Sequence, residues 1–418
     1  MYASDAKHPN SSLEEKLQSI YLLRSGPTVD LTIRKPYMDL LKKLGNPHLN
    51  LAPVIHVAGT NGKGSVISIM RSVLETAGYN VHTYTSPHLI KFNERILING
   101  VPITDDELEA SLDYVLSLNN EAQLTFFEIT TALALYVFAQ HKADFVLLET
   151  GLGGRLDCTN VIDNPLATII TKIGLDHQEF LGQTSKLIAS EKAGIMKRSS
   201  PCIIAPQDFE QVYEVFEKRA NSLPCPLIKA NISQTYMTNL TGAHQIENIA
   251  TAISALNTIT ELNLNPSDIS KGLMSVNWPA RLQKLNINKA PKTTEFWLDG
   301  GHNQSAAYAL SQQASLWKKE DNKELHLILA MMSHKDPRSF IEPLWPYLSG
   351  ISLIPVPGEE CALSPAQLVK EIQLDDTISI SILDGLESLL ANPQEGVRYL
   401  IAGSLYLAGH ILKNYPQY

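Results

Sequence analysis

The chain has 418 residues, of which 44% are hydrophobic and 18% are charged, and its formal net charge is −9 at pH 7. This composition is ordinary for a folded globular protein and excludes a disordered or fibrous chain. The acidic balance argues against a broad nucleic-acid surface, because phosphate backbones are bound by clustered Lys and Arg. The length favours two domains over one.

The first twenty residues are polar and have neither the apolar core of a secretory signal nor an arginine-rich transit pattern. The longest apolar window, Ile129 to Ala139, is too short to span a bilayer. We therefore expect a cytoplasmic protein with no membrane partner and no nucleic-acid partner.

Short β-branched runs alternate with segments of helical periodicity in the first part of the chain. Strands are expected at Pro53–Val57, Val81–Tyr84, Asp144–Leu148, Ala167–Thr171 and Cys202–Ala205. Helices are expected at Gly64–Ala77, Asp105–Ser117, Glu128–His141 and Thr184–Ile195. This alternation predicts an α/β domain around a mostly parallel sheet.

A polar stretch with one proline, residues 286–292, interrupts the pattern and is the predicted linker between domains at 1–285 and 293–418. The strands expected beyond it are Glu295–Leu298, Leu325–Ala330, Ile351–Val356, Ile378–Leu383 and Tyr399–Ile401. Helical segments separate them, so a second, smaller α/β domain is predicted.

A glycine-rich loop follows the first predicted strand; it consists of Gly59, Thr60, Asn61, Gly62, Lys63, Gly64 and Ser65. Backbone N–H groups in such a loop and at the following helix N-terminus can bind phosphate oxygens, and Lys63 adds a full positive charge. The loop departs from the usual P-loop pattern, because Val57 stands at a glycine position and Gly64 at a Ser or Thr position. We interpret it as a nucleoside triphosphate site; a simple turn before a helix is the alternative.

Ligands of open α/β sheets bind beyond the carboxyl ends of the strands. Glu149 directly follows the third strand, where P-loop enzymes place an acidic group on magnesium, and Ser86 follows the second strand. Carboxylate and hydroxyl oxygens suit Mg²⁺, although Glu149 could also be a surface carboxylate. From these residues alone, His177 could be structural and Lys192 a solvated helix lysine.

Five segments share a longer pattern: Gly59–Ser65, Thr85–Leu89, Glu149–Asn160, Leu175–His177 and Glu191–Ile195. With them the chain resembles the folylpolyglutamate synthase and dihydrofolate synthase family, a branch of the Mur-ligase superfamily. The loop of that family reads G-T-N-G-K-G-[ST], so Gly64 is the family's form. Further matches are Gly242–Asn248, Pro279–Gln283, Asp299–Asn303 and Gly403–Tyr406. The resemblance implies a P-loop type domain followed by a smaller Rossmann-like domain.

The resemblance also implies the cofactors and their residues. ATP is expected on the glycine-rich loop with Asn248, Arg281 and Asp299. Two Mg²⁺ sites are implied, with ligands among Ser86, Glu149, His177 and Lys192, the last of these as a carbamate. A carbamate would turn the lysine cation into a carboxylate that tolerates Mg²⁺. Lys63, His177, Lys192 and Arg281 are the expected catalytic residues, and a monovalent cation is a further expected cofactor.

Contacts to a pteroate group are implied for three segments: Thr28, Val29, Asp30 and Leu31; Thr125, Phe126, Phe127 and Glu128; Leu156, Asp157 and Cys158. A flat ring suits the two aromatic side chains, for which core packing is the alternative. His302 and Ser404 are candidates for the glutamate pocket, because they follow strands. Departures from the family pattern occur at Cys158, Ala280, Gln304 and His334.

The implied reaction is ATP-dependent ligation of L-glutamate to 7,8-dihydropteroate and to the γ-carboxylate of reduced folates, through an acyl phosphate. A monofunctional folylpolyglutamate synthase is the alternative. A Mur-type peptidoglycan-precursor ligase is disfavoured, because only about fifty residues precede the loop, too few for an additional α/β domain. An ATP-hydrolysing switch protein does not need the set Glu149, His177 and Lys192. We expect a monomer that acts on small molecules.

Overall fold

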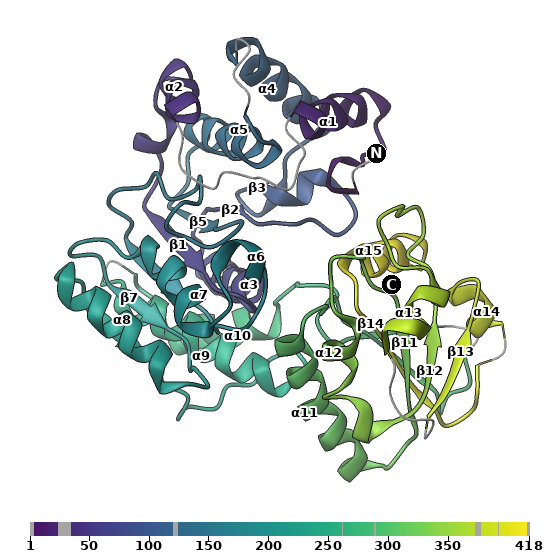
Figure 1. Cartoon of the computed structure of the whole chain (residues 1–418). Helices are drawn as coiled ribbons and strands as arrows, with labels where there is room; N and C mark the ends of the chain where they lie inside the picture. Colours follow the sequence, from purple (N-terminus) through teal and green to yellow (C-terminus); the bar gives the residue numbers. More distant parts are fainter. Residues whose placement is uncertain are drawn as a thin grey trace. The chain divides into compact units, whose positions relative to one another are not determined.

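The computed structural model describes residues 4–23, 35–119, 124–260, 262–287, 290–372, 378–391 and 393–415. The chain folds into two compact units, and Figure 1 labels most of their helices and strands. The large unit contains the described residues of 2–239 and 246–277, and the small unit those of 240–245 and 278–418.

The described part of the large unit is built on an eight-stranded sheet of order β4-β3-β2-β5-β1-β6-β7-β8. The strands from β2 to β8 in this order are parallel, and β3 and β4 form an antiparallel edge. Their bounds are β1 Val54–Ala58, β2 Val81–Tyr84, β3 Ile96–Ile98, β4 Val101–Pro102, β5 Phe145–Glu149, β6 Ala167–Ile170, β7 Cys202–Ile204 and β8 Leu227–Lys229. The five strands predicted in this part of the chain are confirmed, and β3, β4 and β8 are additions.

The large-unit helices are α1 Ser11–Leu23, α2 Lys35–Lys43, α3 Lys63–Thr76, α4 Asp105–Leu118, α5 Phe126–Gln140, α6 Gln178–Leu181, α7 Ser185–Lys192, α8 Glu210–Ser222, most of α9 Ala243–Thr258 and α10 Pro266–Met274. Helix α3 packs on β1, β2 and β5, and α10 packs on α3. Helix α5 contacts α1, α2 and α4, and α7 contacts α8. The sheet and the helices packed on it therefore form one layered α/β unit.

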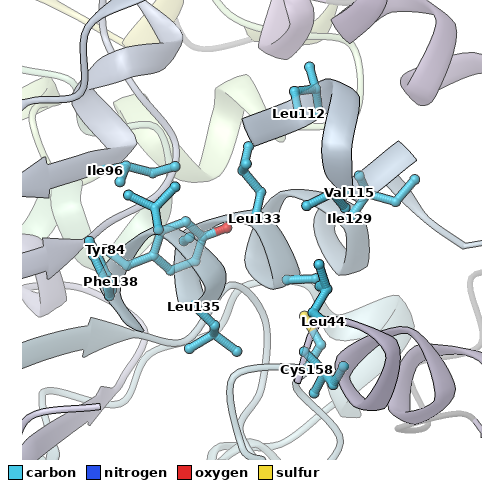
Figure 2. Close-up of a cluster of buried hydrophobic side chains, with 14 of the residues drawn as sticks. Leu44, Tyr84, Ile96, Leu112, Val115, Ile129, Leu133, Leu135, Phe138 and Cys158 are labelled. Carbon is cyan, nitrogen blue, oxygen red and sulfur yellow. The ribbon is translucent and has the colours of Figure 1, made fainter. Parts of the chain in front are cut away.

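Helix α5 is apolar on nearly all sides and is consequently buried. Its side chains Leu133, Leu135 and Phe138 belong to the same buried cluster as Tyr84 of β2, as Figure 2 shows. Full burial of a side chain of this size contributes about 1.5–3 kcal/mol. This packing fixes α5, and with it the polar turn at its N-terminus, where Thr125 is the N-cap residue.

The described part of the small unit contains a six-stranded sheet of order β13-β12-β11-β14-β10-β9. All neighbours are parallel except β9, which is antiparallel to β10. The strands are β9 Gln283–Leu285, β10 Glu295–Leu298, β11 Leu325–Leu329, β12 Leu348–Leu353, β13 Ser379–Ile382 and β14 Arg398–Ala402. The helices are α11 Gln304–Glu320, α12 Pro337–Ile341, α13 Pro365–Ile372, α14 Leu386–Leu390 and α15 Leu405–Asn414.

The division between the units falls earlier than the predicted linker at 286–292. Strand β9 lies inside the predicted first domain, 1–285, yet it pairs with β10 through Gln283, Lys284 and Leu285. Residues 278–285 therefore belong to the small unit, because their backbone hydrogen bonds extend its sheet. The predicted linker therefore falls in the sequence between β9 and β10, two paired strands of the small unit.

Among the helices that the structure describes, none is both long enough and apolar enough to cross a membrane.

Candidate active site

The glycine-rich loop connects β1 to α3 and is held by the segment that follows β6. The N–H of Thr60 donates to the carbonyl of Lys172 at 3.0 Å, and the hydroxyl of Thr171 donates to the carbonyl of Asn61 at 2.7 Å. Gly59 has a φ of 155°, and a Cβ there would lie 1.7 Å from Oγ1 of Thr171. Only glycine can therefore bring the loop this close to the next strand end.

Helix α3 begins at Lys63, so Gly64 and Ser65 lie in its first turn. Gly62 precedes it with a left-handed φ of 88°, and no side chain of a described residue caps the helix at this end. A Cβ on Gly62 would lie 2.4 Å from Oδ1 of Asn248, so this asparagine of α9 packs directly on the loop. The uncapped N–H groups and the helix dipole favour an anion here.

The predicted lysine and carboxylate meet at the end of this loop. Nζ of Lys63 lies 3.7 Å from Oε1 of Glu149, the last residue of β5, which is 4% exposed. The N–H of Ser86 donates to Oε2 of Glu149 at 3.3 Å. The structure thus brings together three of the residues that the sequence analysis placed at separate strand ends.

Lys192, at the end of α7, reaches the same loop. Its Nζ donates to the carbonyl of Gly59 at 2.8 Å, and Nζ of Lys63 donates to the same carbonyl at 3.2 Å. Burial of Lys192, reinforced by the positive charge of Lys63, lowers the pKa of its amine to about 7, against the opposing effect of Asp176 and Asp157. Two lysine side chains thus converge on one carbonyl, an arrangement that favours anionic charge beside them.

His177 is the N-cap residue of the short helix α6, Gln178–Leu181, and has a left-handed φ of 49°. Its N–H donates to Oδ1 of Asp176 at 3.0 Å, and its Nε2 lies 4.0 Å from Oδ2 of the same residue. The imidazole is 41% exposed. Helix α6, which follows His177, contacts α7, which ends at Lys192 (Figure 1).

A divalent cation fits part of this donor set. The described residues contain no group of three or more His, Cys, Asp or Glu side chains that could hold a metal ion. Mg²⁺, however, is commonly held by one or two protein oxygens together with water and substrate phosphates. The adjacent Ser86 and the buried carboxylate of Glu149 meet that requirement.

The predicted pteroate residues of α5 divide into two kinds. Thr125 and Glu128 form a reciprocal capping box: the hydroxyl of Thr125 accepts from the N–H of Glu128 at 3.2 Å, and Oε2 of Glu128 accepts from the N–H of Thr125 at 2.7 Å. Phe126 and Phe127 are half-buried. The ring of Phe127 lies against Gly151, where a Cβ would be 2.3 Å from Cζ.

The predicted pteroate segment Leu156–Cys158 follows a glycine-rich turn at 151–154, and its central acidic residue is buried. Asp157 is 6% exposed, and burial raises the pKa of its carboxyl group despite several hydrogen bonds. Cys158 donates to Oγ1 of Thr131 at 3.2 Å, and burial raises the pKa of its thiol well above the usual range. Leu156 is half-buried. The predicted residues 28–31 lie outside the described part of the chain.

In the small unit, Arg281 lies next to the buried Asp299. Nη1 of Arg281 donates to the carbonyl of Ala280 at 2.8 Å, and Oδ2 of Asp299 accepts from the N–H of Leu282 at 2.9 Å. Ala280 and Leu282, on either side of the arginine, both have left-handed φ values, 56° and 44°. Gly300 allows the close approach, since a Cβ there would lie 2.9 Å from Nη1.

The two glutamate-pocket candidates also lie in the small unit. Nδ1 of His302 is hydrogen-bonded to the carbonyl of Gly300 at 3.2 Å. Ser404 is buried and caps α15 by accepting from the N–H of Leu407 at 3.3 Å. Its hydroxyl therefore has a structural function in addition to any contact with a substrate.

Two charged residues of the large unit lie in this region but were not among the predicted site residues. Asp176 was named only within the segment Leu175–His177. Its carboxylate lies close to His177, and its negative charge raises the pKa of Lys192. Arg95 is 2% exposed and its guanidinium lies 5.6 Å from the ring centroid of Phe126. A charged residue directly before the apolar run Ile96–Ile98 was the available signal for Arg95.

Comparisons with known families agree with this geometry. A model described as the Mur ligase middle domain matches residues 57–237, and one described as the dihydrofolate synthetase C-terminal domain matches residues 283–414. The first match covers the glycine-rich loop, Glu149 and Lys192. The fold and the site thus define a ligase of the Mur type.

Curated relatives narrow the class. The chain is 35% identical over 339 residues to the dihydrofolate synthase/folylpolyglutamate synthase of Bacillus subtilis, covering 73% of this chain and 77% of that protein. It is 32% identical over 422 residues to the folylpolyglutamate synthase of Lacticaseibacillus casei, covering 90% and 92%. The chain belongs to the dihydrofolate synthase/folylpolyglutamate synthase family.

Solved structures agree in fold over almost the whole chain. E. coli FolC in complex with DHPP and ADP has a TM-score of 0.83 at 27% identity, and the match covers 96% of each chain. A bifunctional folylpolyglutamate synthase/dihydrofolate synthase with Mn, AMPPNP and L-glutamate bound has a TM-score of 0.81 at 26% identity, with 98% of each chain covered.

Proposed function

We propose that this protein ligates L-glutamate to folate-type carboxylic acids at the expense of ATP. The observation that carries the proposal is the convergence of Lys63 and Lys192 on the Gly59 carbonyl, beside an uncapped helix N-terminus and the buried Glu149. The loop N–H groups and the lysines suit a polyphosphate, and the carboxylate of Glu149 at the same sheet edge is the proposed ligand of its metal ion. Family membership supplies the substrate class.

ATP is the phosphoryl donor in this proposal. The loop N–H groups and Lys63 hold its phosphates, and Asn248, packed on Gly62, is a further nucleotide contact in the large unit. Arg281 and Asp299 are the proposed nucleotide residues of the small unit. The left-handed residues on both sides of Arg281 fix its backbone, which suits a guanidinium that must meet phosphate charge with little reorganisation.

The chemical step is activation of a carboxylate. A carboxylate oxygen of the acceptor attacks the γ-phosphorus of ATP, ADP leaves, and an acyl phosphate forms. The glutamate amine then attacks the acyl carbon and inorganic phosphate leaves. Lys63 and Arg281 stabilise negative charge on the transferred group, so catalysis consists mainly of positioning and charge neutralisation. No covalent enzyme intermediate is proposed.

Magnesium would be held by Ser86 and Glu149, with His177 and a carbamylated Lys192 at a second site; bound Mg²⁺ would neutralise phosphate charge. Carbamylation requires a neutral amine, and the buried position of Lys192 favours that form near neutral pH. The modification would also replace one of the two converging lysine amines by an anion. Intact-mass measurement of gently handled protein tests it, and a bare amine would refute it.

The acceptor is proposed to lie against Phe126, Phe127 and the turn from Leu156 to Cys158. We propose that both 7,8-dihydropteroate and reduced folates are accepted, as expected for the bifunctional members. A monofunctional folylpolyglutamate synthase is the second candidate, because the Lacticaseibacillus casei relative carries only that name. His302 and Ser404 are the proposed glutamate contacts.

We further propose that the enzyme is a cytoplasmic monomer; light scattering at working concentration tests the oligomeric state. The decisive experiment for the function measures amide product and phosphate with ATP, L-glutamate and either 7,8-dihydropteroate or tetrahydrofolate. Product from both acceptors supports the bifunctional enzyme, and product from tetrahydrofolate alone supports the second candidate. Phosphate release without product, independent of acceptor and glutamate, would refute the ligase and indicate a switch protein.

A further inference from the structure

A buried histidine lies on β1, three residues before the glycine-rich loop. His56 is completely buried, and its neighbours in the sheet register are Leu148 of β5 and Thr168 of β6. Burial, with a smaller contribution from Lys197, lowers the pKa of its imidazole to about 3. The ring is therefore neutral at physiological pH, with one nitrogen protonated and one not.

A hydrogen-bond chain determines which nitrogen carries the proton. Oγ1 of Thr159 donates to Oδ1 of Asp157 at 2.5 Å, and Nε2 of His56 lies 2.8 Å from the same Oγ1. A threonine hydroxyl has a single proton, which the carboxylate receives. Nε2 of His56 must therefore be the donor to Thr159, and Nδ1, which has no hydrogen-bond partner among the described residues, is the unprotonated nitrogen.

Asp157, at the end of this chain, closes the turn that precedes it. Its Oδ2 accepts from the N–H of Leu152 at 2.8 Å, and its Oδ1 accepts from the N–H of Thr159 at 2.9 Å. All these partners are donors, as an ionised carboxylate requires. The carboxylate thus ties the start of the turn, at Leu152, to its end, at Thr159.

This turn packs against two parts of the proposed site with no spare room. A Cβ on Gly151 would lie 2.3 Å from Cζ of Phe127, and a Cβ on Gly154 would lie 3.0 Å from the carbonyl of Lys192. A small displacement of the turn would therefore press it against the ring of Phe127, a proposed acceptor contact, on one side and against the end of α7 on the other. Close-packed interiors transmit such shifts.

We propose that His56 and Thr159 are positioning residues for the acceptor: through Asp157 they tether the 151–159 turn to the strand that carries the ATP loop. The inference rests on the proposed function for the identity of the acceptor. It assigns a use to a buried, neutral histidine that the reaction itself does not require. The Nε2–H tautomer and the ordered turn are properties of the protein without substrate.

The kinetic test removes single hydroxyl groups. Thr159→Val keeps the side-chain shape and removes the donor to Asp157, whereas Thr159→Ser keeps the hydroxyl. We expect Thr159→Val to raise the KM for dihydropteroate or tetrahydrofolate about tenfold, with the KM for ATP within about twofold of wild type, and Thr159→Ser to stay near wild type. Thr168→Val makes the same change on the neighbouring strand β6. Thr168 is not part of the hydrogen-bond chain from His56 to Asp157, so this variant should leave the acceptor KM unchanged.

Two measurements do not depend on ligase activity. Hydrogen exchange of the Leu152 and Thr159 amides should be about tenfold faster in Thr159→Val than in wild type, with α3 amides unchanged. Nitrogen-15 NMR of imidazole-labelled wild-type protein should show His56 as the neutral Nε2–H tautomer from pH 5 to 8. His56→Gln, which presents an N–H at a similar reach, should retain slow exchange in the turn, and His56→Leu should not.

The outcomes are separable. An Nδ1–H tautomer, a protonated His56 ring at pH 6, or unchanged exchange and acceptor KM in folded Thr159→Val would overturn the inference. The inference would also be overturned if kcat fell and every KM rose to the same extent in Thr159→Val and Thr168→Val, because such changes would indicate general destabilisation. An inactive wild-type enzyme with the expected tautomer and exchange would instead refute the proposed function.

Discussion

The neutral, buried His56 makes a quantitative prediction about acid stability. Its pKa is about 3 in the folded chain and 6.5 as the ordinary value. Between these values the unfolded chain binds a proton that the folded chain does not, so stability rises with pH across this window and is lost as the pH falls from 6.5 towards 3. Above pH 6.5 the histidine makes no difference to the slope.

The magnitude follows from this gap. Each unit of pH within the window is worth about 1.4 kcal/mol, so lowering the pH from 7 to 4.5 should cost about 2.5 kcal/mol through His56 alone. Other groups titrate over the same range and must be cancelled. His56→Gln is neutral at every pH and keeps the donor to Thr159, so the difference between wild type and this variant isolates the histidine.

The assay is urea unfolding of both proteins at pH 7 and pH 4.5, followed by two independent probes. We expect the stability difference to shift by about 2.5 kcal/mol in favour of His56→Gln at the lower pH, which corresponds to roughly 1 M in the urea midpoint. Parallel pH profiles for the two proteins would refute the reasoning, since they would mean that His56 titrates alike in both states.

Three further substitutions test the geometry of the site. Lys63→Ala should abolish ATP-dependent product formation with the far-UV circular dichroism of wild type, whereas exposed Lys186→Ala should retain full turnover; a turnover above a few per cent in Lys63→Ala would contradict its function. Gly59→Ala should prevent ATP binding in calorimetry, because the added Cβ would lie 1.7 Å from Oγ1 of Thr171; wild-type affinity would contradict the packing. Thr125→Ala should lower stability by about 1 kcal/mol through loss of the α5 cap, and an unchanged thermal midpoint would contradict it.

The strands and the phosphate loop could be predicted because their signals are local. Val54 to Ala58 is a run rich in β-branched residues and is followed by Gly59, so period and composition suffice to place a parallel strand before a helix. The carboxyl-end rule then brought Glu149 next to Lys63. Neither inference needed knowledge of the packing of distant segments.

The interior polar contacts could not be predicted in the same way. His56 looks like any polar residue within a strand, and its partner Thr159 is 103 positions away in the sequence. Thr125 and Glu128 matched substrate positions, yet they also form the capping box of α5. No strand was predicted at Gln283–Leu285, because an edge strand of three residues carries too little pattern to reveal its partner.

In the proposed reaction, ATP activates the acceptor carboxylate before glutamate is joined to it. The most direct measurement uses dihydropteroate or tetrahydrofolate labelled with oxygen-18 in the reacting carboxylate, together with unlabelled ATP and L-glutamate. We expect one labelled oxygen in the inorganic phosphate for each amide bond formed, because that oxygen bridges carbon and phosphorus in the acyl phosphate. Amide product accompanied by unlabelled phosphate would contradict it.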